Sequence, residues 1–354
     1  MNLMFIAGEA SGDSHAAAVI RHLPARVKTF GAGGSKMQAA GMELLLDLTE
    51  HAVVGLVEVL KNYRKFKRIF DQLVTEAERR RPAAVVLVDF PGFNLRFAAQ
   101  MKKRGIKVIY YISPQLWAWH ASRAQQIERD VDVMLTIFPF EKDWYARNAP
   151  GLKVEFVGHP MAEERRQESE VRSQKTVLLL PGSRVKEVEK LWPVLSRVVD
   201  GMPELEFVAA AADERTASMM RHPRVKVEVG TARDWMRRAA LAITASGTAT
   251  MECAFAGCPM VVVYKVNWLT YLIGRAVVKV NWLAMPNVIA GKAIVPEFIQ
   301  HAATPEAVTQ AVRELAKDTG LQQRELQKVV ASLGGGGCSA RAAELICRAA
   351  TSAT

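Results

Sequence analysis

Short apolar runs alternate with stretches of helical periodicity along the whole chain. In the first half, four runs predict buried strands: Leu3–Ala7, Ala84–Asp89, Lys107–Ser113 and Val133–Phe138. The first run is followed by a loop with Gly8 and Gly12, and a helix is predicted from about Ser14. Strands that alternate with helices in this way predict a parallel sheet covered by helices.

The pattern is interrupted once and then begins again. Residues 161–175 hold four acidic and four basic residues and few apolar ones, which indicates a linker. After it a helix is predicted near Val185, and five further runs predict strands: Thr176–Leu180, Leu205–Ala211, Val225–Val229, Ala239–Ala245 and Pro259–Tyr264.

We therefore expect an α/β protein with two Rossmann-like, doubly wound domains, residues 1–160 and 161–338. A last helix over 339–354 packs back on the first domain or is swapped in a dimer. Ligands of such folds bind at the carboxyl ends of the strands, and the cleft between the two domains is the expected site.

The composition of the chain excludes several classes of protein. The 354 residues include 47 Lys and Arg against 36 Asp and Glu, and half are hydrophobic, which excludes a disordered or collagen-like chain. The four cysteines lack the spacing of a disulfide framework or a zinc site, so we expect a reducing, cytoplasmic setting. The scattered histidines also lack metal-ligand spacing, so we expect no metal, and we expect no cofactor. We recognise no signal peptide and no apolar stretch long enough to span a bilayer.

The first loop, Gly8–Asp13, is neither a G-x-G-x-x-G nor a Walker sequence, so nicotinamide and ATP binding are not supported. Its two carboxylates, Glu9 and Asp13, stand beside Ser11 and suit a ligand rich in hydroxyl groups. The alternative is that Ser11 or Asp13 caps the following helix.

Asp89 ends the apolar strand of the first half that precedes Pro91 and Gly92. A carboxylate there points toward the expected cleft and is partly desolvated, and desolvation raises a carboxyl pKa toward the range of a general base. The alternative is an aspartate that caps a Pro-Gly turn.

The second half of the chain contains residues that could bind an anion. A turn at a strand end places the Arg184 guanidinium at a helix start, and Ser246, Gly247 and Thr248 form another such turn with free backbone N–H groups. Glu252 follows one helical turn later. Together they suit a diphosphate and the hydroxyls of a sugar or ribose. The alternatives are ordinary helix capping and, for Glu252, a solvated helix face.

A basic segment with interleaved aromatic residues suits an anionic membrane surface. Its five cations are Lys61, Arg64, Lys65, Lys67 and Arg68. The alternative is a solvated helix face. Nucleic acid is not an expected partner, because no module that reads RNA or DNA is visible.

Eleven motifs, in order, carry a resemblance to a known family. They are Gly8–Asp13, Gly33–Met37, Val57–Leu60, Asp89–Asn94, Ser113–Trp119, Phe138–Glu141, Gly158–His159, Leu180–Arg184, Ser246–Thr248, Pro286–Asn287 and Val295–Glu297. From about Leu3 to Gln300 the chain resembles the lipid-A-disaccharide synthases, inverting glycosyltransferases of the GT-B architecture.

The resemblance implies a reaction and roles. A UDP-linked diacylglucosamine would donate its sugar to the 6-hydroxyl of diacylglucosamine 1-phosphate, without a metal, giving a β-1,6-linked disaccharide 1-phosphate and UDP. Asp89 would be the base, and Arg184, Asn287 and Glu297 would belong to the nucleotide-sugar side.

The resemblance also bears on the acceptor side and on location. His120 stands where other members often carry Arg or Lys, so Arg123 is a second candidate for the acceptor phosphate. Acylated substrates imply a cytoplasmic protein bound peripherally to the anionic inner face of the inner membrane. A homodimer stays open, because members can swap their C-termini and the glycine run 334–337 could serve as the hinge.

Two other functions remain open on the residues. A nucleotide-sugar epimerase on the same scaffold would share the diphosphate site but need no acyl groove. In a non-catalytic two-lobed nucleotide-sugar binder, Asp89 would be structural.

Overall fold

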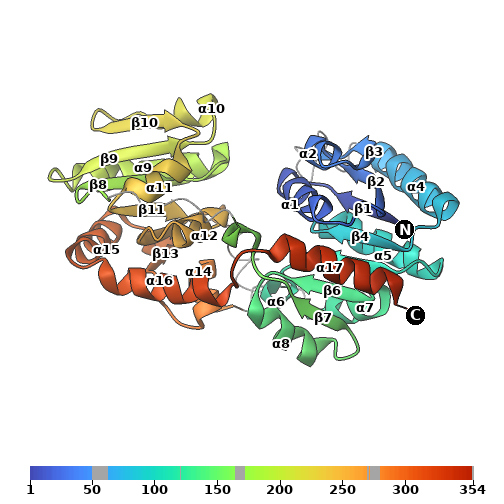
Figure 1. The fold of residues 1–354 in the computed structure, drawn as a ribbon. Helices are drawn as coiled ribbons and strands as arrows, with labels where there is room; N and C mark the ends of the chain where they lie inside the picture. Colours follow the sequence, from blue (N-terminus) through green and yellow to red (C-terminus); the bar gives the residue numbers. More distant parts are fainter. Residues whose placement is uncertain (50–62, 120, 164–171, 269–270, 272–279, 353–354) are drawn as a thin grey trace. The chain divides into compact units, whose positions relative to one another are not determined.

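The computed structural model describes residues 1–49, 63–119, 121–163, 172–268, 271 and 280–352 (Figure 1). The chain divides into two compact units. Unit 1 comprises Met1–Glu163 and Gly334–Thr354, and unit 2 comprises Glu164–Leu333. The glycine run at 334–337, which the sequence assigned to the second domain, thus belongs to unit 1 together with the last helix.

Unit 1 is built on a seven-stranded parallel sheet of order β3-β2-β1-β4-β5-β6-β7. Its strands are β1 (Asn2–Ala7), β2 (Lys28–Gly33), β3 (Glu43–Asp47), β4 (Ala84–Val88), β5 (Val108–Tyr111), β6 (Val133–Thr136) and β7 (Lys153–Phe156). Its helices are α1 (Ala10–Arg21), α2 (Ser35–Ala39), α4 (Tyr63–Arg80), α5 (Pro91–Lys103), α6 (Leu116–Trp119), η2 (Ala121–Arg123), α7 (Ala124–Asp130), α8 (Pro139–Asn148), η3 (Pro160–Ala162) and α17 (Cys338–Thr351). The central strands β4 and β5 are buried along their whole length, which explains their unbroken apolar sequences.

Unit 2 repeats the plan with a six-stranded parallel sheet of order β10-β9-β8-β11-β12-β13. Its strands are β8 (Thr176–Leu180), β9 (Glu206–Ala211), β10 (Val225–Val229), β11 (Leu241–Ala245), β12 (Met260–Tyr264) and β13 (Glu297–Ile299). Its helices are α9 (Val185–Asp200), α10 (Glu214–Ala217), α11 (Ala232–Arg238), α12 (Thr248–Phe255), α14 (Met285–Ala290), η4 (Gln300–Ala302), α15 (Pro305–Lys317) and α16 (Gly320–Ser332). The expected α/β fold with two Rossmann-like domains is confirmed.

Helix α17 packs on unit 1, against α1 and β5 (Figure 1). The Glu163 carboxylate accepts hydrogen bonds from the backbone N–H and the hydroxyl of Ser339, both at 2.7 Å. Arg341 donates to the Val157 carbonyl at 2.9 Å, and the Lys107 ammonium donates to the Ala349 carbonyl at 2.8 Å. The helix is therefore fixed at both ends to its own chain, and a swapped dimer stays a prediction.

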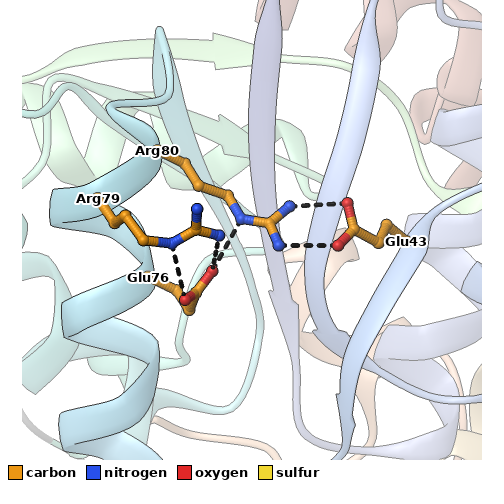
Figure 2. A network of polar contacts seen from close by, with 4 residues as sticks. All are labelled: Glu43, Glu76, Arg79 and Arg80. Atoms are coloured by element: carbon orange, nitrogen blue, oxygen red, sulfur yellow. Dashed lines mark hydrogen bonds and ion pairs between the residues drawn. The ribbon is translucent and has the colours of Figure 1, made fainter.

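The end of α4 is tied to the edge strand β3 by a network of four charged residues (Figure 2). The Arg80 guanidinium donates two hydrogen bonds to the Glu43 carboxylate, at 2.7 and 2.8 Å, and a third to Glu76 at 2.8 Å. Arg79 also pairs with Glu76, and Arg80 lies 4.7 Å from the centre of the Phe30 ring. The hydrogen bonds from Arg79 and Arg80 lower the pKa of Glu76 to about 2.

Candidate active site

In unit 1 the order of connection reverses between β1 and β4, so the loops after these two strands meet at a topological switch point. The loop after β1 contributes Gly8 and Glu9, and the loop after β4 contributes Asp89. Asp89 and Phe90 both adopt left-handed backbone conformations, with φ of 47° and 49°. Two such non-glycine residues in succession store strain, which is concentrated at functional sites in proteins.

The strained turn is held from several sides. The Asp89 carbonyl accepts a hydrogen bond from the Tyr110 hydroxyl at 2.6 Å and another from the Asn94 side-chain amide at 2.7 Å. The Phe90 ring packs over Gly8, where a Cβ atom would lie 2.2 Å from the ring. Only glycine therefore leaves room for Phe90 in this position.

The environment of the Asp89 carboxyl raises its pKa from 3.8 to about 6. Burial is the largest cause, the Glu9 charge adds to it, and the backbone of Phe90 partly offsets both. A carboxyl with a pKa near 6 is mostly ionised at neutral pH yet more basic than usual, as a general base requires.

Of the other predicted acceptor-side residues, Asp13 has a clear structural role. It is buried, and its carboxylate accepts backbone hydrogen bonds from Gly34 at 2.9 Å and from Lys36 and Met37 at 3.1 Å, so that it caps α2. The predicted start of the helix at Ser14 is wrong, because α1 begins at Ala10.

Glu9 and Ser11 are exposed at the beginning of α1, and Arg123 is exposed in η2. His120 lies outside the described residues. The acceptor-side roles of these four residues and of Asp13 therefore stay predictions.

A buried polar group next to the Ser113–Trp119 motif escaped the sequence analysis. Glu141 is buried in α8 and accepts a hydrogen bond from the Trp117 indole at 3.3 Å. Burial raises the pKa of Glu141 to about 8, and the Ser113 hydroxyl lies 2.9 Å from the Tyr145 hydroxyl. The motif Phe138–Glu141 was visible in the sequence, but nothing in it indicated a buried neutral acid.

In unit 2 the switch point lies between β8 and β11. The loop after β8 carries Gly182, with φ of 113°, and the Glu187 carboxylate accepts the backbone N–H groups of Ser183 at 3.0 Å and Arg184 at 3.2 Å. The Arg184 side chain is 83% exposed and lies 3.6 Å from the same carboxylate. Its guanidinium is thus presented at the carboxyl end of the sheet.

The loop after β11 carries the predicted anion turn. Ser246 donates to the Leu283 carbonyl at 3.2 Å, and Gly247 precedes α12 with Thr248 exposed at its start. Glu252 forms an ion pair with Arg233 at 3.4 Å. The two switch-point loops bring Arg184 and the start of α12 to the same edge of the sheet.

Asn287 and Glu297, predicted for the nucleotide-sugar side, form hydrogen bonds within unit 2. The Asn287 amide donates to the Val295 carbonyl at 2.8 Å and to Glu297 at 2.7 Å, and its oxygen accepts two backbone N–H groups. The Glu297 carboxylate also accepts the N–H groups of Leu283 at 2.9 Å and Ala284 at 3.1 Å. Glu297 therefore holds the segment before α14, and Asn287 ties α14 to the segment that follows it. The sequence did not indicate these contacts, and the nucleotide-sugar roles of both residues stay predictions.

The predicted membrane segment is described only in part. Lys61 lies outside the described residues, as do the side chains of Arg64 and Lys65. Lys67 and Arg68 are exposed on α4, whose apolar side chains enter the core of unit 1: Ile69, Leu73, Val74 and Ala77. This burial explains the interleaved apolar residues beyond position 68 without a membrane.

In the described part of the chain, no helix is both long and apolar enough to cross a bilayer. Within the same residues, no group of three or more His, Cys, Asp and Glu side chains could hold a metal ion.

Comparison with known proteins gives consistent matches. The family model described as lipid-A-disaccharide synthetase matches residues 3–345, beyond the Gln300 limit of the motifs. The lipid-A-disaccharide synthase of Geobacter sulfurreducens is 37% identical and covers 97% of this chain and 96% of its own. That of Nitrosococcus oceani is 40% identical and covers 92% and 90%.

Solved structures share the fold at low identity. A glycosyltransferase of kitacinnamycin matches with a TM-score of 0.69 at 18% identity, over 98% of both chains. The UDP-GlcNAc 2-epimerase of Neisseria meningitidis, bound to UDP-GlcNAc, gives 0.68 at 12%, over 98% of this chain and all of its own. MurG of Acinetobacter baumannii gives 0.58 at 16%, over 98% and 99%. Both glycosyltransferases and epimerases use this fold, so the fold alone does not choose between them.

Proposed function

Because the chain belongs to the lipid-A-disaccharide synthetase family, we propose that it joins UDP-2,3-diacylglucosamine to 2,3-diacylglucosamine 1-phosphate by an inverting, metal-independent displacement. The family match agrees with the resemblance carried by the motifs and does not favour the epimerase or the non-catalytic binder.

The step at the acceptor needs a base. The 6-hydroxyl of the acceptor attacks C1 of the donor sugar, and the Asp89 carboxylate takes the hydroxyl proton as the new C1–O6 bond forms. The observation that carries this role is the environment of Asp89, a strained switch-point turn in which the carboxyl has a pKa of about 6.

The step at the donor needs charge stabilisation. The C1–O bond to the diphosphate breaks, and its electron pair leaves with UDP, which develops negative charge. The exposed guanidinium of Arg184 and the N-terminus of α12 are the groups proposed to stabilise that charge. Asn287 and Glu297 would act through the backbone segments on either side of α14 that they hold in place.

The reaction is tested directly with the two acylated substrates in detergent micelles, with and without EDTA, by measuring UDP and disaccharide. Equal disaccharide formation in both conditions is expected. Absence of disaccharide from folded protein would overturn the proposal, and isomerisation of the UDP-sugar without an acceptor would indicate the epimerase.

The role of Asp89 is tested separately. Asp89→Asn should lower kcat by about 100-fold or more while binding of UDP, measured by calorimetry, is retained. Asp143→Asn, which removes an exposed carboxylate from α8 of the same unit, is the control for loss of one charge. Full activity of Asp89→Asn would exclude Asp89 as the base.

We also propose that the protein works at the anionic inner face of the membrane as a peripheral protein. The exposed cations Lys67 and Arg68 support this, as do the acyl chains of the proposed substrates. Flotation with vesicles that contain anionic lipid should recover the protein, and Lys67→Glu with Arg68→Glu should reduce that recovery. Equal flotation with neutral vesicles would contradict an electrostatic contact.

A further inference from the structure

The backbone of the turn that carries Asp89 is strained. Asp89 and Phe90 have left-handed backbone conformations, which residues with a Cβ atom rarely adopt. Such strain persists only where the surrounding structure enforces it. A relaxed turn would carry the Asp89 carboxyl elsewhere. The groups that fix this backbone therefore decide where the carboxyl points.

Two buried donors converge on a single acceptor in this turn. The Tyr110 hydroxyl from β5 and the Asn94 amide from α5 both donate to the Asp89 carbonyl, at 2.6 and 2.7 Å. A carbonyl oxygen has two lone pairs, so this acceptor is fully used. The Asn94 amide also donates to the Val88 carbonyl at 3.2 Å and thereby bridges the strand end and the turn.

The chemistry of Asn94 points to a purpose beyond packing. Its side-chain amide is fully buried, yet its Oδ1 atom has no hydrogen-bond partner. An unsatisfied buried acceptor costs stability that an apolar residue of similar size would not. The donor half of this amide is the half in use, and it is directed at the backbone of the turn.

We propose that Tyr110 and Asn94 are positioning residues that clamp the Asp89 carbonyl and so aim the Asp89 carboxyl at the acceptor hydroxyl. This inference rests on the proposed role of Asp89 as the base. The side chains of Tyr110 and Asn94 are fully buried, so they act through the turn. Their contribution is to the geometry of proton transfer, which tolerates little displacement.

The chain provides a matched control in the next residue. Tyr111 follows Tyr110 in β5, is equally buried, and lies on the opposite face of the sheet. Its hydroxyl has no hydrogen-bond partner. Tyr110→Phe and Tyr111→Phe therefore remove the same atom from neighbouring buried rings, and only the first removes a contact to Asp89.

The test measures kcat, KM for both substrates and the pH dependence of kcat for these two variants and for Asn94→Ala. Tyr110→Phe and Asn94→Ala should each lower kcat by at least about tenfold and change KM by less than about twofold. Tyr111→Phe should leave kcat and KM unchanged.

The pH profile separates positioning from a general loss of structure. Glu9 is the ionisable group whose charge raises the pKa of the Asp89 carboxyl, and the Asp89 charge in turn adds to the effect of burial that raises the pKa of Tyr110. When the turn relaxes toward water, the acid limb of the kcat profile should move to lower pH in Tyr110→Phe and Asn94→Ala. It should stay in place in Tyr111→Phe.

The outcomes distinguish this inference from the proposed function. If Asp89→Asn keeps its activity, the base assignment fails, and the positioning role fails with it. If Asp89→Asn is inactive while the two clamp variants match Tyr111→Phe in kcat and acid limb, only the positioning role is overturned. Because either donor tests the clamp, a variant that fails to fold is replaced by the other, and circular dichroism reports which one is folded.

Discussion

Replacing Asp89 with Asn should lower kcat by about 100-fold or more and at the same time stabilise the protein near neutral pH. Asn keeps the shape of the side chain but removes a charge that the turn holds away from water. The pKa of Asp89 is raised to about 6, first by burial and then by the Glu9 charge. The fold therefore works against the ionised form, which is the form that a base requires.

The size of the effect follows from the pKa. The folded-state value of about 6 lies about 2 above the ordinary 3.8, which corresponds to about 3 kcal/mol. Because the pKa of Asp89 is raised in the folded state, the free energy of unfolding of the wild-type protein falls by this amount as the pH rises from below 3.8 to above 6. At higher pH it changes little. The advantage of Asp89→Asn should be about 1.5 kcal/mol at pH 5 and about 3 kcal/mol at pH 7.

Urea unfolding of both proteins at pH 5 and pH 7 measures this difference. Hydrogen exchange of the β4 amides identifies the transition that belongs to unit 1. The variant's advantage should grow by about 1.4 kcal/mol, or tenfold in the unfolding equilibrium constant, between the two pH values. A difference that does not change with pH would refute the reasoning, whatever its size. Asp143→Asn again controls for the loss of one carboxylate.

Three further substitutions test the surroundings of the site. Glu297→Gln places amide hydrogens against the backbone N–H groups that the carboxylate now accepts, so UDP affinity, measured by calorimetry, should fall about tenfold. Burial raises the pKa of Glu141 to about 8, so the wild-type protein loses stability as this carboxyl ionises, and Glu141→Gln does not. The free energy of unfolding of Glu141→Gln relative to wild type should therefore rise from pH 5 to about pH 8 and level off above. Thermal unfolding measured across this pH range checks it. Glu163→Ala removes the cap at Ser339 and should destabilise α17 by about 1 kcal/mol, seen as several-fold faster hydrogen exchange in that helix.

The sequence predicted most of the strands, including the edge strand β10, and missed β2, β3, β7 and β13. β1, β4, β8, β11 and β12 are almost wholly buried, and their apolar runs were found to within two residues. The missed strands lack such runs. β2 contains two glycines, β3 and β7 are partly exposed at or near the sheet edges, and β13 has three residues and begins with Glu297.

The candidate site was only partly predictable for a related reason. Asp89 was found because its place at a strand end can be seen along the chain. Tyr110 and Asn94 could not be found, because their contacts to Asp89 come from folding the chain back over 21 and 5 residues. The contacts of Asp13 at the start of α2 could not be predicted either, because they join residues 21 to 24 positions apart.

The two interpretations of Asp89, catalytic base or turn cap, predict opposite electrostatics, and the same chain provides the comparison. Asp213 is a cap: its carboxylate accepts the Thr216 N–H at 2.7 Å, and the pKa of Asp213 is lowered by the hydrogen bonds from Thr216. A cap is stabilised by its charge, since the hydrogen bonds favour the ionised form. At Asp89 the pKa is raised instead, and the backbone contact from Phe90 does not compensate for burial and the Glu9 charge. A carboxylate that weakens the fold in its ionised form, on a backbone that is itself strained, has no use as a cap. This cost supports the proposal that the ionised form of Asp89 is needed for chemistry.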